Sequence, residues 1–403
     1  MAFNEAQKRA IRHTDGPALV LAGPGSGKTT VITNRVRYLT EKVGVEPGNI
    51  LVITFTRAAA HEMKERYERI TGTGCSRVSF GTFHSVFFMI LKLAYRYQAS
   101  NIVKEEQRIQ FIREQLDRTN LEIEDEGEFI SSVLSEISLI KGELMSLDNY
   151  YAKSCSQTVF KELYDGYEHR LRKQGLLDFD DMLAMCYELF KERKDILQAW
   201  QRKYKYILID EFQDINQIQY EIVKMLALPE NNLFIVGDDD QSIYRFRGAR
   251  PELMLGFEKD YPDAERILLD VNYRCVDPVI ESAGKLIANN KTRFQKEIHG
   301  NRGKGCPVFV KEWPDPLAET KAITEELRDY HKMGIAYEDM AVLYRTNQGP
   351  RLLIERMMEY NIPFHMRDTV PNLYEHWISR NVFCYIYAAL GDLSRSNILQ
   401  IIN

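Results

Sequence analysis

Short apolar runs alternate with longer stretches of helical periodicity along much of the chain. Six of these runs have the length of strands: 18–22, 50–54, 77–80, 206–209, 233–236 and 266–270. An alternation of strand-like runs with helical patterns is typical of an α/β protein built on a parallel sheet. We therefore predict the α/β fold class, with a parallel sheet.

The strand pattern disappears between residues 85 and 177. Apolar residues lie on one helical face in 109–116 and again in 130–137. Because residues three and four apart share a face of a helix, we predict a helical segment here. We interpret it as an insertion, since the strand pattern resumes after it.

A second α/β pattern begins near residue 306. It predicts strands and helices in alternation, ending in a helical stretch: strands 307–313 and 340–344, helices 317–331 and 350–360, and helix 377–390. A chain of 403 residues is long enough for two or three domains.

Composition and charge narrow the class of protein. The net charge of −5 gives no overall basic character, so any contact with nucleic acid must use a local groove. The six cysteines are scattered without metal-binding spacing, and we expect reduced thiols. Since no apolar run reaches 18 residues, we expect no membrane span and a cytoplasmic location.

A glycine-rich loop, AGPGSGKTT at 22–30, directly follows the first predicted strand. Its glycines let the backbone point N–H groups at an anion, and the next helix adds the positive end of its dipole. Lys28 can reach the β and γ phosphates, and the Thr29 hydroxyl can ligate magnesium. The residues expected around the phosphates are Gly23, Gly25, Ser26, Gly27, Lys28 and Thr29. We predict a nucleoside triphosphate site, provided that Ala22, in place of the usual first glycine, keeps a negative φ.

Two carboxylates, Asp210 and Glu211, directly follow the predicted strand 206–209. In an open α/β sheet, ligands bind at the carboxyl ends of the strands. Asp210 would hold magnesium, and Glu211 would orient and deprotonate an attacking water. The pair is a weak signal alone and a strong one beside a phosphate loop.

The segment VGDDDQSIYRFRGA at 236–249 also begins with a strand that ends in carboxylates. An amide follows at Gln241, and aromatic and cationic residues then alternate: Tyr244, Arg245, Phe246 and Arg247. Bases stack on rings and phosphates meet guanidinium groups, so this alternation fits single-stranded nucleic acid. A turn followed by a pair of core aromatic residues explains the segment equally well.

The order of the motifs resembles one family. From the N-terminus they read FNEAQ, AGPGSGKTT, ITFTRAAAHEM, GTFHS, DEFQD, VGDDDQSIYRFRGA, LDVNYR and AVLYRTNQGPRLLIERMMEYNIPF. The series resembles the superfamily 1 DNA helicases of the UvrD/Rep/PcrA group, over nearly the whole chain. The resemblance implies a RecA-like P-loop fold and an ATP-dependent 3′–5′ DNA helicase of the DNA repair type. It further implies ATP and Mg²⁺ as cofactors, and single-stranded DNA and 3′-tailed duplex as substrates.

The resemblance also implies roles for residues around the nucleotide. Gln7 would read adenine, Tyr273 would stack near the base, and Arg274 would be an arginine finger. Gln241 would sense the γ-phosphate and couple it to DNA. Thr30 departs from the family, in which arginine usually contacts the nucleotide at this position.

A track for single-stranded DNA is implied in the same way. Its residues would be Phe55, Arg57, His84, Tyr244, Phe246 and Arg247. Phe246 replaces a common tryptophan and offers a smaller stacking area, and Arg57-Ala58 replaces a common Asn-Lys pair.

The resemblance also implies a division of the chain into the family's domains. Residues 1–84 and 178–267 would form the first RecA-like domain, and 85–177 its helical accessory domain. Residues 268–366 would begin the second RecA-like domain, and 367–403 a second insertion. Since the family's last motifs find no match, we expect an N-terminal portion that is weakly active or inactive alone.

Two alternative functions remain open from the sequence. The chain could be the motor portion of an ATP-dependent helicase–nuclease, which a nuclease domain in a longer product would reveal. It could also be a non-catalytic fragment that binds ATP and DNA, which an ATP turnover assay with and without single-stranded DNA would distinguish. Protein partners are not indicated by any motif.

Overall fold

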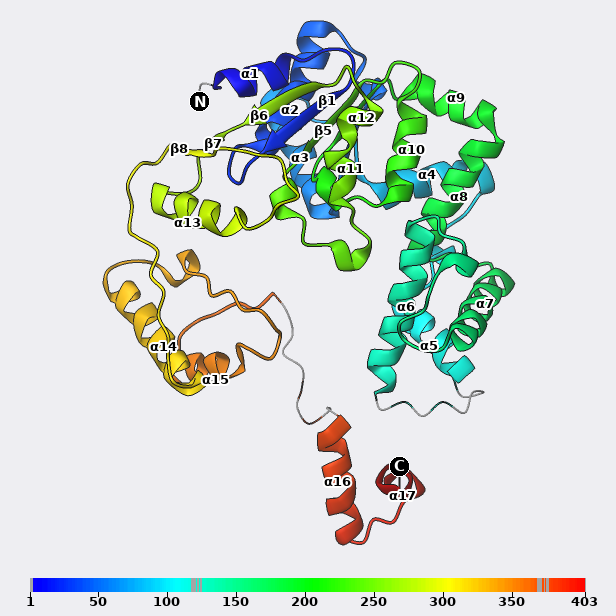
Figure 1. Ribbon diagram of the computed structural model, residues 1–403, viewed down its shortest axis with the longest axis vertical. Coiled ribbons are helices and arrows are strands. Elements are labelled where there is room, and N and C mark those ends of the chain that lie inside the picture. Colours follow the sequence, from blue (N-terminus) through cyan, green and yellow to red (C-terminus); the bar gives the residue numbers. More distant parts are fainter. Residues whose placement is uncertain are drawn as a thin grey trace. The chain divides into compact units, whose positions relative to one another are not determined.

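The computed structural model describes residues 3–116, 121, 123, 125–367, 372, 374 and 377–402 (Figure 1). The chain divides into two compact units, one ending at Val308 and one beginning at Phe309. None of the helices in the described ranges combines the length and the apolar character needed to cross a membrane.

A six-stranded parallel sheet forms the centre of the first unit. In spatial order its strands are β3 (Ser79–Thr82), β2 (Ile50–Thr54), β4 (Tyr206–Ile209), β5 (Leu233–Gly237), β1 (Ala18–Ala22) and β6 (Glu265–Leu269). The predicted α/β class and all six strands are confirmed, although β3 lies two residues later than expected.

Both faces of this sheet are covered by helices. Successive side chains of a strand point to opposite faces; Leu19 and Leu21 belong to one hydrophobic core, and Val20 to the other. The core around Val20 contains α1 (Glu5–Arg12), α2 (Lys28–Tyr38) and α3 (Arg57–Thr71). The opposite core contains α4 (Phe83–Tyr95), α8 (Phe179–Glu192), α9 (Lys194–Lys203), α10 (Gln217–Ala227), α11 (Pro251–Leu255) and α12 (Phe257–Asp260).

Capping side chains fix where several of these helices begin. Thr56, Thr82 and Asp178 each accept a hydrogen bond from a backbone N–H in the first turn of α3, α4 and α8. Such caps satisfy N–H groups that have no partner inside the helix. They place Arg57 and Phe179 at the first positions of α3 and α8, which later bear on the site.

A third hydrophobic core lies among α5 (Glu105–Leu116), α6 (Glu126–Gly142) and α7 (Gln157–Gln174). The helical prediction for this part of the chain is confirmed. Although α4 falls mostly within the same predicted range, Phe87 and Ile90 pack into the core of the sheet. The separate helical core begins only at Val103.

The first unit ends in a small substructure after β6. Strand β7 (Val271–Asn272) pairs in parallel with β8 (His299–Gly300), and α13 (Asp277–Ile287) connects them. A π-helix, η1 (Leu39–Val43), and short 3₁₀ helices link the larger elements of the two units: η2 (Pro47–Asn49), η3 (Ala99–Asn101), η4 (Leu147–Asn149), η5 (Phe212–Asp214), η6 (Asp239–Gln241) and η7 (Arg245–Arg247) in the first, and η8 (Tyr337–Asp339) in the second.

The second unit contains helices but lacks the strands that we predicted. Its helices are α14 (Pro316–Lys332), α15 (Arg351–Glu359), α16 (Trp377–Ala389) and α17 (Arg395–Ile402). The strand predictions at 307–313 and 340–344 are wrong for the described chain, where both segments are irregular. Val310 and Leu343 are 95% and 94% exposed. A strand needs a hydrogen-bonded neighbour, and neither segment has a ladder partner among the described residues.

Candidate nucleotide and nucleic-acid site

The ends of three strands gather the candidate residues at one edge of the sheet. The glycine loop follows β1, the pair Asp210 and Glu211 follows β4, and Asp238 follows β5. Strand β5 lies between β4 and β1, and all three are parallel. Their carboxyl ends therefore open at the same edge, where ligands bind in sheets of this type.

The glycine loop has the backbone conformation that a phosphate cradle requires. Gly25 and Gly27 have φ values of 64° and 87°, in the left-handed region that favours glycine. A Cβ atom on Gly25 would also lie 2.8 Å from Asn272 Oδ1. Ala22 is the last residue of β1 and is not among the residues with positive φ, so the condition that we placed on it is met.

Lys28 at the start of α2 reaches across to the acidic pair. Its Nζ lies 2.8 Å from Glu211 Oε2, and Gln213 Nε2 donates to the same oxygen at 2.9 Å. Glu211 has a φ of 52°, which is unusual for a residue other than glycine. Residues with such strained backbone conformations cluster at functional sites. The lysine of the loop and the predicted base are therefore in direct contact.

Asp210 is a buried carboxyl group at this edge. Burial, with a contribution from the charge of Glu211, raises its pKa to about 7, and Lys28 opposes this shift. Its Oδ1 is buried without a hydrogen-bond partner. A buried oxygen of this kind needs an explanation, and a magnesium ion, which prefers oxygen ligands, provides one. Asp210 therefore fits as a residue that would hold the metal, whereas the role of Thr29, the second residue of α2, stays a prediction.

The shift of Asp210 predicts a pH-dependent stability in the absence of magnesium. Between about pH 4 and pH 7 the folded chain keeps a proton on Asp210 that the unfolded chain has released, so this group's contribution to the free energy of unfolding falls as the pH rises. Asp210→Asn cannot ionise. We expect the variant to gain stability relative to wild type between about pH 5 and about pH 8 in urea unfolding. An unchanged difference between the two proteins would contradict the assigned burial.

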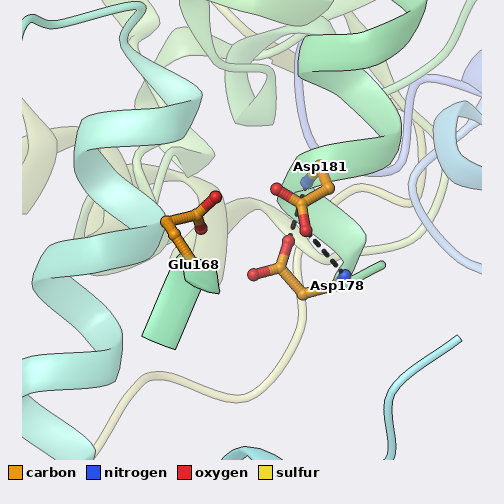
Figure 2. Close-up of side chains that lie close together, drawn as sticks. All are labelled: Glu168, Asp178 and Asp181. Carbon is orange, nitrogen blue, oxygen red and sulfur yellow. Dashed lines mark hydrogen bonds between the residues drawn. The ribbon is translucent and has the colours of Figure 1, made fainter. Parts of the chain in front are cut away.

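Another carboxylate cluster resembles a metal site but already holds a cation. Figure 2 shows Asp178 and Asp181 at the start of α8, joined by reciprocal hydrogen bonds, with Glu168 of α7 close by. The Nζ of Lys141 lies 2.6 Å from Glu168, 2.8 Å from Asp178 and 2.7 Å from Asp181. An ammonium group thus occupies the position that a metal ion would take.

Residues from distant parts of the sequence meet beside the loop. Gln7 Nε2 donates to the backbone oxygen of Ser26 at 3.0 Å, and the backbone N–H of Tyr273 donates to the oxygen of Gly25 at 3.0 Å. Asn4 Nδ2 donates to the Tyr273 hydroxyl at 3.1 Å. The predicted adenine-side residues Gln7 and Tyr273 are therefore brought together on the loop.

In the structure an arginine lies beside Thr30, the position at which the family usually has an arginine. Arg66 of α3 donates from Nη1 to Thr30 Oγ1 at 3.1 Å. No motif in the sequence points to Arg66, which occupies an ordinary position on a polar face of α3. The exposed Arg274 stands next to the loop, with its Cβ 2.7 Å from where a Cβ on Gly25 would be.

The predicted DNA-binding residues form two aromatic groups. The rings of Phe55 and Tyr244 stack at 4.9 Å, and Phe246 lies 6.1 Å from Tyr244. Phe246 is 73% exposed, which excludes the alternative of a core aromatic pair. The side chain of Arg247 lies outside the described residues.

The second group contains a residue that the sequence analysis missed. His84 meets Phe179 edge-on at 5.3 Å, and Phe179 is exposed at the first position of α8. Burial, followed by the nearby charge of Arg57, lowers the pKa of His84. The only sequence signal for Phe179 was its position, directly after the helix-capping Asp178.

A parallel sheet with a phosphate loop after its first strand and an acidic pair at the same edge is the architecture of P-loop proteins with a RecA-like fold. The family model described as the UvrD/REP helicase N-terminal domain matches residues 3–262. The model described as the UvrD-like helicase C-terminal domain matches residues 267–403. The chain belongs to the UvrD/REP helicase family.

The names of similar curated proteins are consistent with this family assignment. "Putative ATP-dependent DNA helicase YjcD" of Bacillus subtilis (strain 168) is 39% identical over 97% of this chain and 52% of its own length. "ATP-dependent DNA helicase PcrA" of Staphylococcus aureus (strain Mu50) is 37% identical over 90% of this chain and 50% of its own length. The chain spans about half the length of the curated relatives that it matches.

Proposed function

We propose that this chain carries the ATP-binding and single-strand-binding parts of an ATP-dependent DNA helicase that moves 3′ to 5′. The observation that carries the proposal is the contact between Lys28 and Glu211, beside the unpartnered oxygen of Asp210. These groups are the ones that phosphoryl transfer to water requires. The proposed substrates are ATP with magnesium, single-stranded DNA and 3′-tailed duplex.

The domain assignment is part of the proposal. Residues 1–84 and 178–267 would form the first motor domain, 85–177 its accessory domain, and 268–366 the start of the second motor domain. The remaining residues, 367–403, would begin a further insertion. The separate hydrophobic core of α5, α6 and α7 supports an accessory domain.

The ion pair of Lys28 suggests how nucleotide binding prepares hydrolysis. In the structure, Lys28 is bound to Glu211. The phosphates of ATP carry more negative charge than one carboxylate and would draw Lys28 away. Glu211 would then be free to accept a proton from the attacking water. A magnesium ion held by Asp210 and Thr29 would supply positive charge to the β and γ phosphate oxygens.

The exposed rings provide a surface on which bases can stack. Phe246 and Phe179 present open aromatic area, and Arg57 supplies a cation near His84. Stacking tolerates every base because each has a π-face. We therefore assign these residues to a single-strand track that does not read sequence.

Replacing the exposed rings should weaken DNA binding without changing base preference. We expect Phe246→Ala and Phe179→Ala each to cost about 1–3 kcal/mol of binding free energy for an oligonucleotide, measured by fluorescence anisotropy. Tyr151→Ala is the matched control, because Tyr151 is 86% exposed but lies on the helical insertion. Equal binding by folded Phe246→Ala, Phe179→Ala and control proteins would refute the track.

A further inference from the structure

Three consecutive carboxylates follow β5, and all of them bind one lysine. Asp238 is fully buried, and η6 carries Asp239 and Asp240. The Nζ of Lys296 lies 2.6 Å from Asp238, 2.5 Å from Asp239 and 3.0 Å from Asp240. The Lys296 side chain is only 1% exposed. This lysine was not singled out by any sequence motif.

The neighbouring residues complete the arrangement. Arg293 donates from Nε and Nη2 to the two oxygens of Asp240, both at 2.7 Å. The backbone N–H of Phe294 donates to Asp239 Oδ2 at 2.8 Å. Two cations thus face three carboxylates, and Lys296 is the group that reaches Asp238. We call these five charged residues the carboxylate clasp: Asp238, Asp239, Asp240, Arg293 and Lys296.

Asp238 connects the clasp to the proposed nucleotide sensor. One oxygen, Oδ1, binds Lys296, and the other, Oδ2, accepts from Gln241 Nε2 at 2.6 Å. Hydrogen bonds to a charged acceptor are about twice as strong as those between neutral groups. Because Lys296 offsets part of the negative charge of Asp238, it affects how strongly Asp238 holds the Gln241 amide.

A second set of hydrogen bonds leads from Asp238 to the catalytic edge. Its backbone N–H donates to Gln213 Oε1 at 3.0 Å, and Gln213 Nε2 donates to Glu211. Glu211 in turn binds Lys28. The segment that carries Lys296 also touches the phosphate loop, because Ile298 Cδ1 lies 2.5 Å from where a Cβ on Gly23 would be. The clasp and the loop are therefore parts of one connected network.

We propose that Lys296 is a positioning residue of the nucleotide site, which neutralises Asp238 and so leaves Gln241 able to exchange Asp238 for the γ-phosphate. The proposal rests on the proposed function, since it assumes an ATP site that includes Gln241. With Lys296 present, Asp238 shares its negative charge with an ammonium group, so it holds the Gln241 amide less tightly than an unpaired carboxylate would. Without it, Asp238 holds the amide more tightly, so the preference for a triphosphate over a diphosphate falls.

The test compares a triphosphate with a diphosphate by calorimetry on the full chain. We expect Lys296→Met to weaken binding of ATPγS with magnesium about tenfold or more, which is the loss of a hydrogen bond to a charged group. Binding of ADP should stay unchanged, because ADP has no γ-phosphate. Lys296→Arg should restore the preference, and Lys161→Met, in an exposed ion pair, is the control.

Gln241→Ala tests whether Lys296 acts through the amide. This variant should show the same loss of preference, and adding Lys296→Met to it should cause no further loss. Since Lys296→Met leaves buried carboxylates without a cation and could unfold the chain, Lys296→Met/Asp239→Asn is a second variant. It removes one of these charges and retains the contact between Asp238 and Gln241.

The outcomes separate this proposal from the proposed function. Loss of the triphosphate preference in a folded Lys296 variant, with ADP binding intact, supports the positioning role. Equal weakening of both ligands, or an unchanged preference, overturns it and leaves the ATP site standing. If the wild-type chain binds neither ligand, the proposed function fails and this proposal fails with it.

Discussion

Glu211→Gln should slow ATP hydrolysis by about 10²- to 10⁴-fold, which is the typical contribution of a general base. Nucleotide binding should not weaken and should become tighter, because Lys28 would lose the carboxylate that competes with the phosphates for it. The measurement is single-turnover hydrolysis with protein in excess, with magnesium and single-stranded DNA present, together with equilibrium binding of ATPγS.

The control for this experiment is Glu221→Gln. Glu221 on α10 forms an ion pair with Lys224 at 2.9 Å and belongs to no part of the proposed site. Its hydrolysis rate should equal that of wild type. A Glu211→Gln protein with undiminished hydrolysis would show that the water is activated by another group.

Lys141→Met should strongly destabilise the fold. Lys141 supplies the cation among three buried or half-buried carboxylates, and Asp178 also accepts from the Tyr167 hydroxyl at 3.1 Å. Breaking a buried ion pair by removing one partner costs about 3–5 kcal/mol. The measurement is the free energy of unfolding in urea.

Lys161→Met provides the comparison for Lys141→Met. Lys161 pairs with Asp148 at 2.9 Å, but both side chains are exposed, so removal of its charge should change little. If the two variants unfold at the same urea concentration, the buried network does not hold α6, α7 and α8 together.

Local sequence patterns were sufficient to predict the six strands of the large sheet and the residues at its ligand-binding edge. An apolar run that leads into a glycine loop specifies a strand, a turn and a helix within a dozen residues, so β1 and the position of Lys28 followed from the sequence. The proximity of Glu211 followed because parallel strands end at one edge. The wrong strand predictions at 307–313 and 340–344 show the limit of this reasoning. An apolar run does not by itself supply the neighbouring strand that a sheet requires.

Contacts between distant segments were the part that could not be predicted. The position of Lys296 at Asp238 depends on how the chain returns after α13, and that of Arg66 at Thr30 on how α3 packs against α2. The contact of its ring with His84 is what makes Phe179 a candidate. A single sequence carries no signal for such pairs, because their spacing along the chain is arbitrary.

The most direct test of the ATP site is calorimetric titration of wild type and Lys28→Ala with ATPγS and magnesium. Loss of a hydrogen bond to a charged group costs about 1.5–3 kcal/mol. We therefore expect saturable binding by wild type and about ten- to a hundredfold weaker binding by Lys28→Ala. Thermal unfolding of the two proteins should be similar, because Lys28 is partly exposed and packs in no hydrophobic core. Equal affinity of both folded proteins would contradict the assignment.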